Sequence, residues 1–160
     1  MTRFDRMGVR GYASAAVILF ALTAWPSTGW SRELGCVDVT ETQIADLFVR
    51  WNDALRTLDP DKVADNYARD ATLLPTVENG PLVTREELIA YFTVFLKKKP
   101  VGAIDKRVIR IGCNVAVDIG LYTFTYGTGD PPTPARYTYI YEYAGGRWLI
   151  AHHHSSKRPE

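Results

Sequence analysis

The sequence has only two cysteines, almost no net charge and no long hydrophobic run. Lys plus Arg total 19 against 18 for Asp plus Glu, so the formal charge is +1 and no basic stripe suggests nucleic-acid binding. No segment reaches the roughly 18 uninterrupted apolar residues of a membrane-spanning helix. A Gly-rich phosphate loop, a His-Arg-Asp loop and an Asp-Phe-Gly motif are also missing, so kinase chemistry is not expected. What remains is a chain of 160 residues with globular composition, enough for one domain.

Residues 1–31 have the layout of a secretory signal peptide. A basic start precedes an apolar run over residues 13–22, and helix-breaking and small residues follow. We expect cleavage near Ser31 and a periplasmic or secreted location, with an uncleaved N-terminal anchor as the alternative. Residues 32–39 would then be a lead-in segment, and residues 40–160 would form the domain.

The two cysteines, Cys36 and Cys113, both follow the expected signal peptide. Because an exported chain folds in an oxidising compartment, we expect one intramolecular disulfide that ties the lead-in to a strand. Two separate buried thiols are the alternative. Catalytic cysteine chemistry is disfavoured, since no histidine or basic residue stands beside either cysteine in the sequence.

The hydrophobic periodicity predicts helices first and strands afterwards. Capping boxes predict helices that begin after Thr40 and Thr84, and the pair Asp59-Pro60 predicts a short helix between them that carries Tyr67 and ends before Asp70. A brief strand is expected over residues 71–76.

From Val101 onward the apolar period falls from 3.6 to 2, which is typical of strands. Four strands are predicted over residues 104–111, 115–126, 135–143 and 147–155. Helices do not alternate with these strands, so we expect an antiparallel sheet with the helices gathered on one face, an α+β fold shaped as a cone.

Several short motifs occur together in a characteristic order. They are Leu47-Phe48, Trp51-Asn52, Asp59-Pro60, Tyr67-Ala68, Leu73-Leu74-Pro75, Gly112-Cys113-Asn114, Ala135-Arg136-Tyr137-Thr138 and Trp148 with the run His152–Ser156. Through these motifs, residues 38–160 resemble the bacterial stand-alone relatives of the association (hub) domain of calcium/calmodulin-dependent protein kinase II. That family belongs to the nuclear transport factor 2-like superfamily, also called SnoaL-like.

The resemblance implies a curved antiparallel sheet wrapped around a pocket by N-terminal helices. In the kinase, this domain assembles subunits without catalysis, and its pocket contains arginines that can hold carboxylates. Relatives in the superfamily include isomerases, cyclases and dehydratases, so the fold does not settle the chemistry. Kinase activity and calmodulin binding belong to the kinase's other domains, and neither is expected here.

Arg136 is the first candidate for ligand binding. It shares one face of its strand with Thr138, Ile140 and Glu142. If that face is concave, the guanidinium projects into an aromatic pocket and suits a small carboxylate. The alternative is a surface arginine paired with an acid.

The opposite face of the same strand is aromatic. If the arginine face is concave, this aromatic face points outward and forms the interface of a homodimer or larger assembly. Its members are Tyr137, Tyr139, Tyr141 and Tyr143.

The histidine run supplies the second group of candidates. Alternation puts His152 and His154 on one face with Ile150 and sends His153 to the other. The pair could form structural hydrogen bonds, line the pocket or act as acid and base. No metal is expected, because a zinc site needs a third ligand and no carboxylate stands at a recognisable spacing.

Trp51 and Tyr67 are the third group. Aromatic residues at helical spacing are usually core, but the hydroxyl of Tyr67 needs a partner when buried, and the short second helix would bring it to the pocket mouth. Of the carboxylates, Asp118 comes nearest to a catalytic base.

We therefore expect an exported, oligomeric and non-catalytic domain that binds a small carboxylate or polar-aromatic ligand and needs no cofactor. An isomerase- or cyclase-type enzyme that uses a pocket histidine or aspartate is the alternative. A pure assembly scaffold with an inert pocket is the third possibility.

Overall fold

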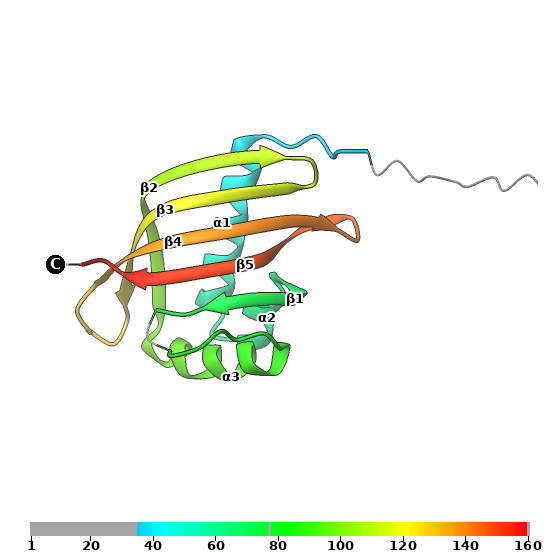
Figure 1. Cartoon of the computed structure of the whole chain (residues 1–160). Coiled ribbons are helices and arrows are strands. Elements are labelled where there is room, and N and C mark those ends of the chain that lie inside the picture. The colour runs from blue at the N-terminus through cyan, green and yellow to red at the C-terminus, as the bar shows by residue number, and fades with distance from the viewer. Residues whose placement is uncertain (1–34, 77, 160) are drawn as a thin grey trace, which may run out of the picture. The chain divides into compact units, whose positions relative to one another are not determined.

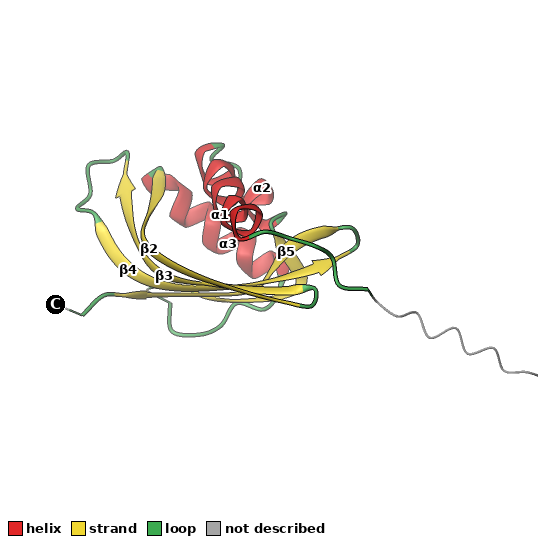
Figure 2. Cartoon of the chain, turned by 90° about the horizontal axis from the view of Figure 1, so that it is seen from above, coloured by secondary structure: helices red, strands yellow, loops and turns green. Residues whose placement is uncertain are grey.

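A computed structural model of the chain describes residues 35–76 and 78–159 (Figure 1). The expected signal peptide lies outside these residues, so it stays a prediction. Within the described part, three α-helices lie on one face of a curved five-stranded sheet, which confirms the predicted α+β architecture (Figure 2). No helix of this part is long and apolar enough to cross a membrane.

The helices begin where the sequence places their caps. Helix α1 (Glu41–Arg56) starts at Thr40 with a complete capping box, and α3 (Arg85–Phe95) starts at Thr84 with another. Helix α2 (Pro60–Ala64) is a single short turn, and a 3₁₀ turn η1 (Leu96–Lys98) continues α3.

Helix α1 packs across the concave face of the sheet. Its buried residues recur at helical spacing, and Asn52 fixes the helix to the neighbouring strand. The Asn52 side chain donates to the carbonyl of Gly102 at 3.0 Å and accepts from its N–H at 2.8 Å. A Cβ on Gly102 would meet the Phe48 ring at 3.1 Å, so glycine permits this close approach.

The prediction that Tyr67 lies on the second helix is wrong. Helix α2 ends at Ala64, and Tyr67 begins strand β1 (Tyr67–Leu74). The Asn66 side chain donates to the last helical carbonyls, including that of Val63, and the Asn66 carbonyl accepts from Ile150 in the last strand. Tertiary pairing therefore overrides the local helical pattern.

The sheet has the order β1-β5-β4-β3-β2. Its other strands are β2 (Pro100–Gly112), β3 (Val115–Tyr126), β4 (Thr133–Ala144) and β5 (Arg147–Lys157). Neighbouring strands are antiparallel as predicted, except that β1 pairs parallel with β5 at the edge. Gly145 and Gly146 join β4 to β5 with positive φ at both positions, as a tight two-residue hairpin requires.

The two faces of β4 are the reverse of those predicted. Tyr137, Tyr139 and Tyr141 are at most 3% exposed and belong to the core, where the Tyr139 ring packs against Phe48 and Trp51 of α1. Arg136 and Glu142 are exposed on the outer face of the sheet. The tyrosine rings carry more apolar area than Arg136, Thr138 and Glu142, so burying them is the more stable choice.

In β5, the predicted faces are exchanged after Ile150 because of a β-bulge. Tyr141 pairs with Ile150 but Ile140 pairs with His152, which leaves Ala151 as an extra residue. The alternation therefore slips by one position after Ile150, and His153 becomes the buried histidine.

The predicted disulfide between Cys36 and Cys113 is confirmed. Asn114, in the turn after Cys113, reinforces it: its Oδ1 accepts from the Val37 N–H at 2.8 Å, and its Nδ2 donates to the Gly35 carbonyl at 3.2 Å. The described end of the lead-in is thus fastened to the β2–β3 turn.

Candidate functional site

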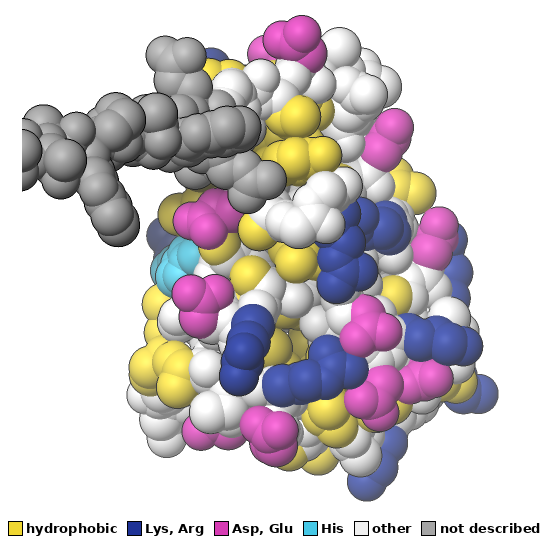
Figure 3. Space-filling view, turned by 90° about the vertical axis from the view of Figure 1, so that its right-hand side faces the viewer, with side chains coloured by type: hydrophobic (Ala, Val, Ile, Leu, Met, Phe, Trp, Pro, Cys, Tyr) yellow, Lys and Arg dark blue, Asp and Glu magenta, His cyan; other side chains and the backbone are white. Residues whose placement is uncertain are grey.

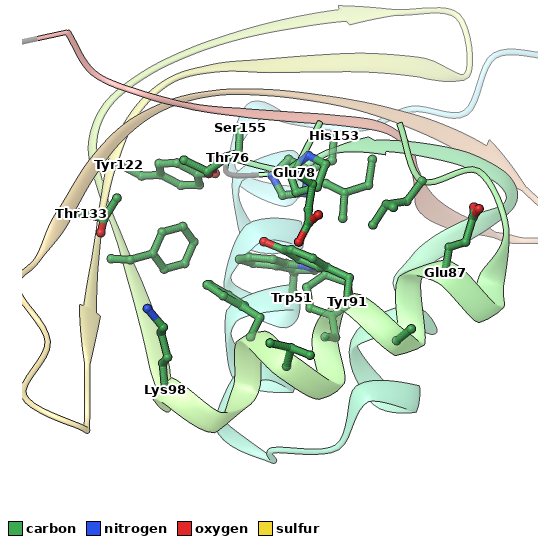
Figure 4. Close-up of a pocket in the computed structure, with 18 of the residues that line it drawn as sticks. Trp51, Thr76, Glu78, Glu87, Tyr91, Lys98, Tyr122, Thr133, His153 and Ser155 are labelled. Carbon is green, nitrogen blue, oxygen red and sulfur yellow. Dashed lines mark hydrogen bonds between the residues drawn. The ribbon is translucent and has the colours of Figure 1, made fainter. Parts of the chain in front are cut away.

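A cavity of about 490 Å³ lies between α3 and the concave face of the sheet (Figure 4). This volume falls within the range of small-molecule sites, roughly 300–1,000 Å³. The walls are mostly apolar, with a large aromatic share from α1, α3 and β3. They include Trp51, Tyr91, Phe92, Phe95, Tyr122 and Phe124.

His153 lines this cavity from β5. Its side chain is 3% exposed, and its ring stacks on Tyr139 with the centroids 4.1 Å apart. Within the described residues, its Nε2 is buried and has no hydrogen-bond partner. An unpartnered buried polar atom costs free energy, so this nitrogen is a candidate ligand contact.

The other imidazole nitrogen is held by a chain of hydrogen bonds. The indole N–H of Trp51 donates to the Tyr67 hydroxyl at 3.2 Å, and that hydroxyl lies 2.9 Å from Nδ1 of His153. Tyr67 therefore accepts from Trp51 and can give its single proton to Nδ1. If the imidazole carries its proton on Nε2, Nδ1 can accept the Tyr67 hydroxyl hydrogen. If the proton is on Nδ1, the Tyr67 hydroxyl hydrogen is left without this acceptor, so the Nε2-protonated tautomer is favoured.

Burial keeps this imidazole uncharged. It lowers the pKa of His153 to about 3, with smaller contributions from His152 and His154. The ring is therefore neutral near pH 7, where it is a hydrogen-bond donor through Nε2 and a poor proton acceptor.

Hydroxyl groups form a second polar cluster beside His153. Tyr122 donates to Oγ of Ser155 at 2.6 Å, and Ser155 shares a hydrogen bond with Thr76. Tyr91 extends from α3 across the cavity (Figure 4). Burial raises the pKa of Tyr91 and of Tyr122, so both hydroxyls stay neutral.

The charged side chains among the described lining residues all lie at the solvent-exposed side of the cavity. Glu78, Glu87 and Lys98 are all exposed. The Glu87 carboxylate caps α3 by accepting from the N–H groups of Val83 and Thr84. Lys98 lies 3.8 Å from Asp130, its acidic partner.

The predicted site residues fall into two separate groups. Trp51 lines the cavity and Tyr67 supports it through His153. Arg136, Thr138 and His154 instead line a shallower depression on the outer face of the sheet. The prediction that Arg136 projects into the aromatic pocket is therefore wrong.

His152 also lies on the outer side of the β5 register, opposite Ile140. The expectation that His152 and His154 share the pocket with Ile150 fails because the bulge at Ala151 separates them from that residue. The histidine of the cavity is His153, which sequence reasoning assigned to the wrong face.

Asp118 belongs to a buried cluster outside the cavity lining. Its side chain is fully buried and forms an ion pair with Arg107 at 3.0 Å, and it accepts from the Tyr137 hydroxyl at 2.8 Å. Burial raises the pKa of Asp118, while Tyr137 and Arg107 oppose the shift. These contacts make Asp118 a structural partner rather than a free base.

Within the described residues, no group of three or more histidine, cysteine, aspartate or glutamate side chains is arranged to hold a metal ion. The donors at the cavity, a single imidazole and several hydroxyls, suit an organic ligand better than a cation.

Comparison with solved structures places this geometry among known folds. A candidate calcium/calmodulin-dependent protein kinase II association domain from Xanthomonas campestris is 48% identical, with a TM-score of 0.73 over 77% of this chain and 91% of that chain. An NTF2-like protein of unknown function from Pseudomonas putida is 20% identical, with a TM-score of 0.68 over 79% of this chain and 92% of that one.

A candidate dehydratase of the NTF2-like family from Streptomyces avermitilis shares the fold at 11% identity, with a TM-score of 0.67 over 74% of this chain and 96% of that one. Comparison with curated proteins finds no match. The model of the calcium/calmodulin-dependent protein kinase II association domain matches residues 40–159. The chain therefore belongs to the calcium/calmodulin-dependent protein kinase II association domain family and has an NTF2-like fold.

Proposed function

We propose that the protein is an exported, self-associating domain that binds a small polar-aromatic molecule in the cavity and carries out no reaction on it. The observation that carries this proposal is the largely apolar cavity lined by His153, whose buried Nε2 has no hydrogen-bond partner among the described residues. Apolar walls with a few fixed polar groups are the usual composition of a ligand site.

Among the described lining residues the carboxylates, Glu78 and Glu87, are both exposed, and no buried carboxylate stands in the wall as a base, which favours binding over catalysis. A general base works best when its pKa lies near the working pH. Burial holds the pKa of His153 near 3, and the Glu87 carboxylate is engaged at the α3 cap. Asp118, the carboxylate expected to come nearest to a base, is paired with Arg107 outside the cavity lining.

An isomerase- or cyclase-type enzyme remains the second candidate function. The hydrogen-bonded pair Tyr67–His153 favours it, because a buried N–H can stabilise an oxyanion that develops during a reaction. This activity would use His153 rather than His152 or His154.

Self-association is supported by the family and by the outer face of the sheet. The name of the family describes an association domain. Val108 and Ile119, cross-strand partners on this face, are 40% and 39% exposed, and the less exposed Leu121 and Ile140 lie on the same face. A second copy of the chain, packed sheet to sheet about a two-fold axis, would bury this apolar surface.

The end of the domain that carries the β2–β3 and β4–β5 turns has a different surface. Acidic and basic side chains are mixed there, without a field of one sign (Figure 3). Charge therefore gives that end no preference for a strongly acidic or basic partner, and we assign self-association to the outer face of the sheet.

Export is supported by the Cys36–Cys113 disulfide, since such bonds persist in oxidising compartments. The intact mass of protein from the periplasm or medium tests this part. We expect a chain that begins near residue 32 and gains about two daltons on reduction. An unprocessed chain with two free thiols contradicts it.

The binding function is tested with N-phenyl-1-naphthylamine, a neutral dye whose fluorescence rises in apolar cavities. We expect saturable binding of one dye per chain. Ala90→Phe narrows the mouth, because Ala90 is exposed on α3 and lines the cavity. It should reduce binding, whereas Val83→Phe, at an exposed position outside the lining, should not. Non-saturable binding that neither variant changes would reject the cavity as a ligand site.

A further inference from the structure

We propose that the cavity selects an uncharged, planar molecule whose carbonyl oxygen accepts a hydrogen bond from Nε2 of His153. This inference rests on the proposed binding function and names the chemical class of the ligand. The ligand class differs from the small carboxylate that an arginine in the pocket would bind, because Arg136 lies on the outer face.

The hydrogen-bond partners of His153 determine whether its Nε2 donates a hydrogen bond to the ligand or accepts one from it. Trp51 can only donate, so the Tyr67 oxygen accepts from it and the Tyr67 proton is available for Nδ1. The proton of the neutral ring then resides on Nε2, which is buried and has no partner among the described residues. The matching ligand atom is an acceptor, and a carbonyl oxygen supplies one without charge.

The charges around the cavity disfavour an anion. Among the described lining residues, Lys98 is the only side chain with a positive charge, and it lies at the mouth beside Asp130. Glu78 and Glu87 add exposed negative charge to the lining. A carboxylate next to His153 would lose its hydration and gain only neutral donors, which is costly in free energy.

The walls favour a flat ring. Phe95 meets Phe124 edge to face at 5.5 Å and lies nearly parallel to Tyr91 at 5.7 Å. The Trp51 and His153 rings meet edge to face with their centroids 5.6 Å apart. Aromatic faces and edges arranged in this way pack best on another aromatic or conjugated ring.

Three probes of one shape separate charge from hydrogen bonding. They are 2-acetylnaphthalene, a neutral ketone; naphthalene-2-carboxylate, its anionic isostere; and 2-ethylnaphthalene, which has no acceptor. Each is titrated against the mature, disulfide-bonded protein by displacement of N-phenyl-1-naphthylamine. We expect the ketone to bind tightest and the carboxylate to bind on the order of a hundredfold more weakly than the ketone.

A variant of His153 identifies the donor. His153→Leu should weaken binding of the ketone about tenfold and leave 2-ethylnaphthalene nearly unchanged, because only the ketone loses a hydrogen bond. His154→Leu, one residue away but exposed on the outer face, is the matched control and should change neither affinity.

If His153→Leu does not fold, the tautomer of His153 can be measured instead. The experiment is nitrogen NMR of the unmodified protein labelled with ¹⁵N-histidine. The inference predicts the resonance pattern of a neutral ring protonated on Nε2 for His153 at pH 7. Protonation on Nδ1 would overturn the inference.

The outcomes distinguish this inference from the function on which it rests. Carboxylate binding as tight as ketone binding, or an equal loss for all probes in His153→Leu, overturns the ligand class and leaves the binding function standing. If neither the dye nor any of the three probes binds saturably, the binding function itself fails.

Discussion

His153 and His154 are neighbours in one strand, yet they occupy opposite regions of the molecule. His153 faces the concave side, where it is buried, uncharged and joined to Tyr67. His154 faces the outer side, where it is exposed beside Thr138. The difference agrees with the proposed division of the sheet, in which the concave face lines a cavity and the outer face carries the apolar surface that we propose for self-association.

The largest effect should come from placing a charge on each face of β4. Tyr139→Glu buries a carboxylate among aromatic rings and should lower the free energy of unfolding by more than about 4 kcal/mol. Thr138→Glu, the adjacent outward position, should lower the free energy of unfolding of the single chain, measured below the dimer dissociation constant, by less than about 0.5 kcal/mol. Chemical denaturation measures both, and equal losses would mean that the two faces do not differ.

Self-association should respond only to the outer face. Ile119→Glu places a charge in the centre of the apolar surface and should raise the dimer dissociation constant on the order of a hundredfold without unfolding the chain. Val49→Glu, at an exposed position of α1, is the control. Light scattering that gives the mass of one chain for the unmodified protein at micromolar concentration would refute this assignment.

Acid should destabilise the protein through His153. In the unfolded chain this histidine takes up a proton near pH 6.5, but in the folded chain it does so only near pH 3. Stability is therefore lost as the pH falls below 6.5, by roughly 1.5 kcal/mol between pH 6.5 and 5. The neighbouring Tyr67 and Tyr139 hydroxyls do not titrate in this window, because burial raises their pKa.

Thermal unfolding at several pH values measures this loss. His153→Gln should flatten the pH dependence, while His154→Gln should preserve it. A variant at position 153 that keeps the full slope would show that His153 does not carry the effect.

The smallest effect concerns an unsatisfied hydroxyl. The Tyr139 hydroxyl is buried and has no hydrogen-bond partner within the described residues. Tyr139→Phe removes the polar atom and keeps the ring, so it should stabilise the fold by up to about 1 kcal/mol. Tyr122→Phe is the contrasting variant, since the Tyr122 hydroxyl donates to Ser155, and it should destabilise the fold. Calorimetry that gives both variants the same sign would contradict this distinction.

Local signals predicted the elements well. Helices begin after Thr40 and Thr84 because the threonine side chains accept hydrogen bonds from free backbone N–H groups. A capping box involves only four consecutive residues, so it can be recognised in the sequence. Strand β3 spans Val115–Tyr126, the predicted range, because its alternation is uninterrupted. The Cys36–Cys113 pairing followed from there being only two cysteines.

The functional faces could not be predicted in the same way. Alternation assigns residues of β4 to two groups, but nothing local says which group packs on α1. Tyrosine fits both a core and an interface. The arginine of the family pocket favoured a concave position for Arg136, and this placed the tyrosines on the outer face. The bulge at Ala151 and the parallel pairing of β1 with β5 depend on contacts far apart in the sequence. His153 was missed for that reason.

We propose that the ligand binds on the concave side of the sheet, in contact with His153. Nitrogen NMR of ¹⁵N-histidine-labelled protein, recorded while 2-acetylnaphthalene is added at pH 7, tests it most directly. We predict that the Nε2 resonance of His153 shifts progressively and saturates, while the resonances of His152 and His154 stay in place. Saturable shifts at His152 or His154 with His153 unmoved would contradict the account and assign binding to the outer face.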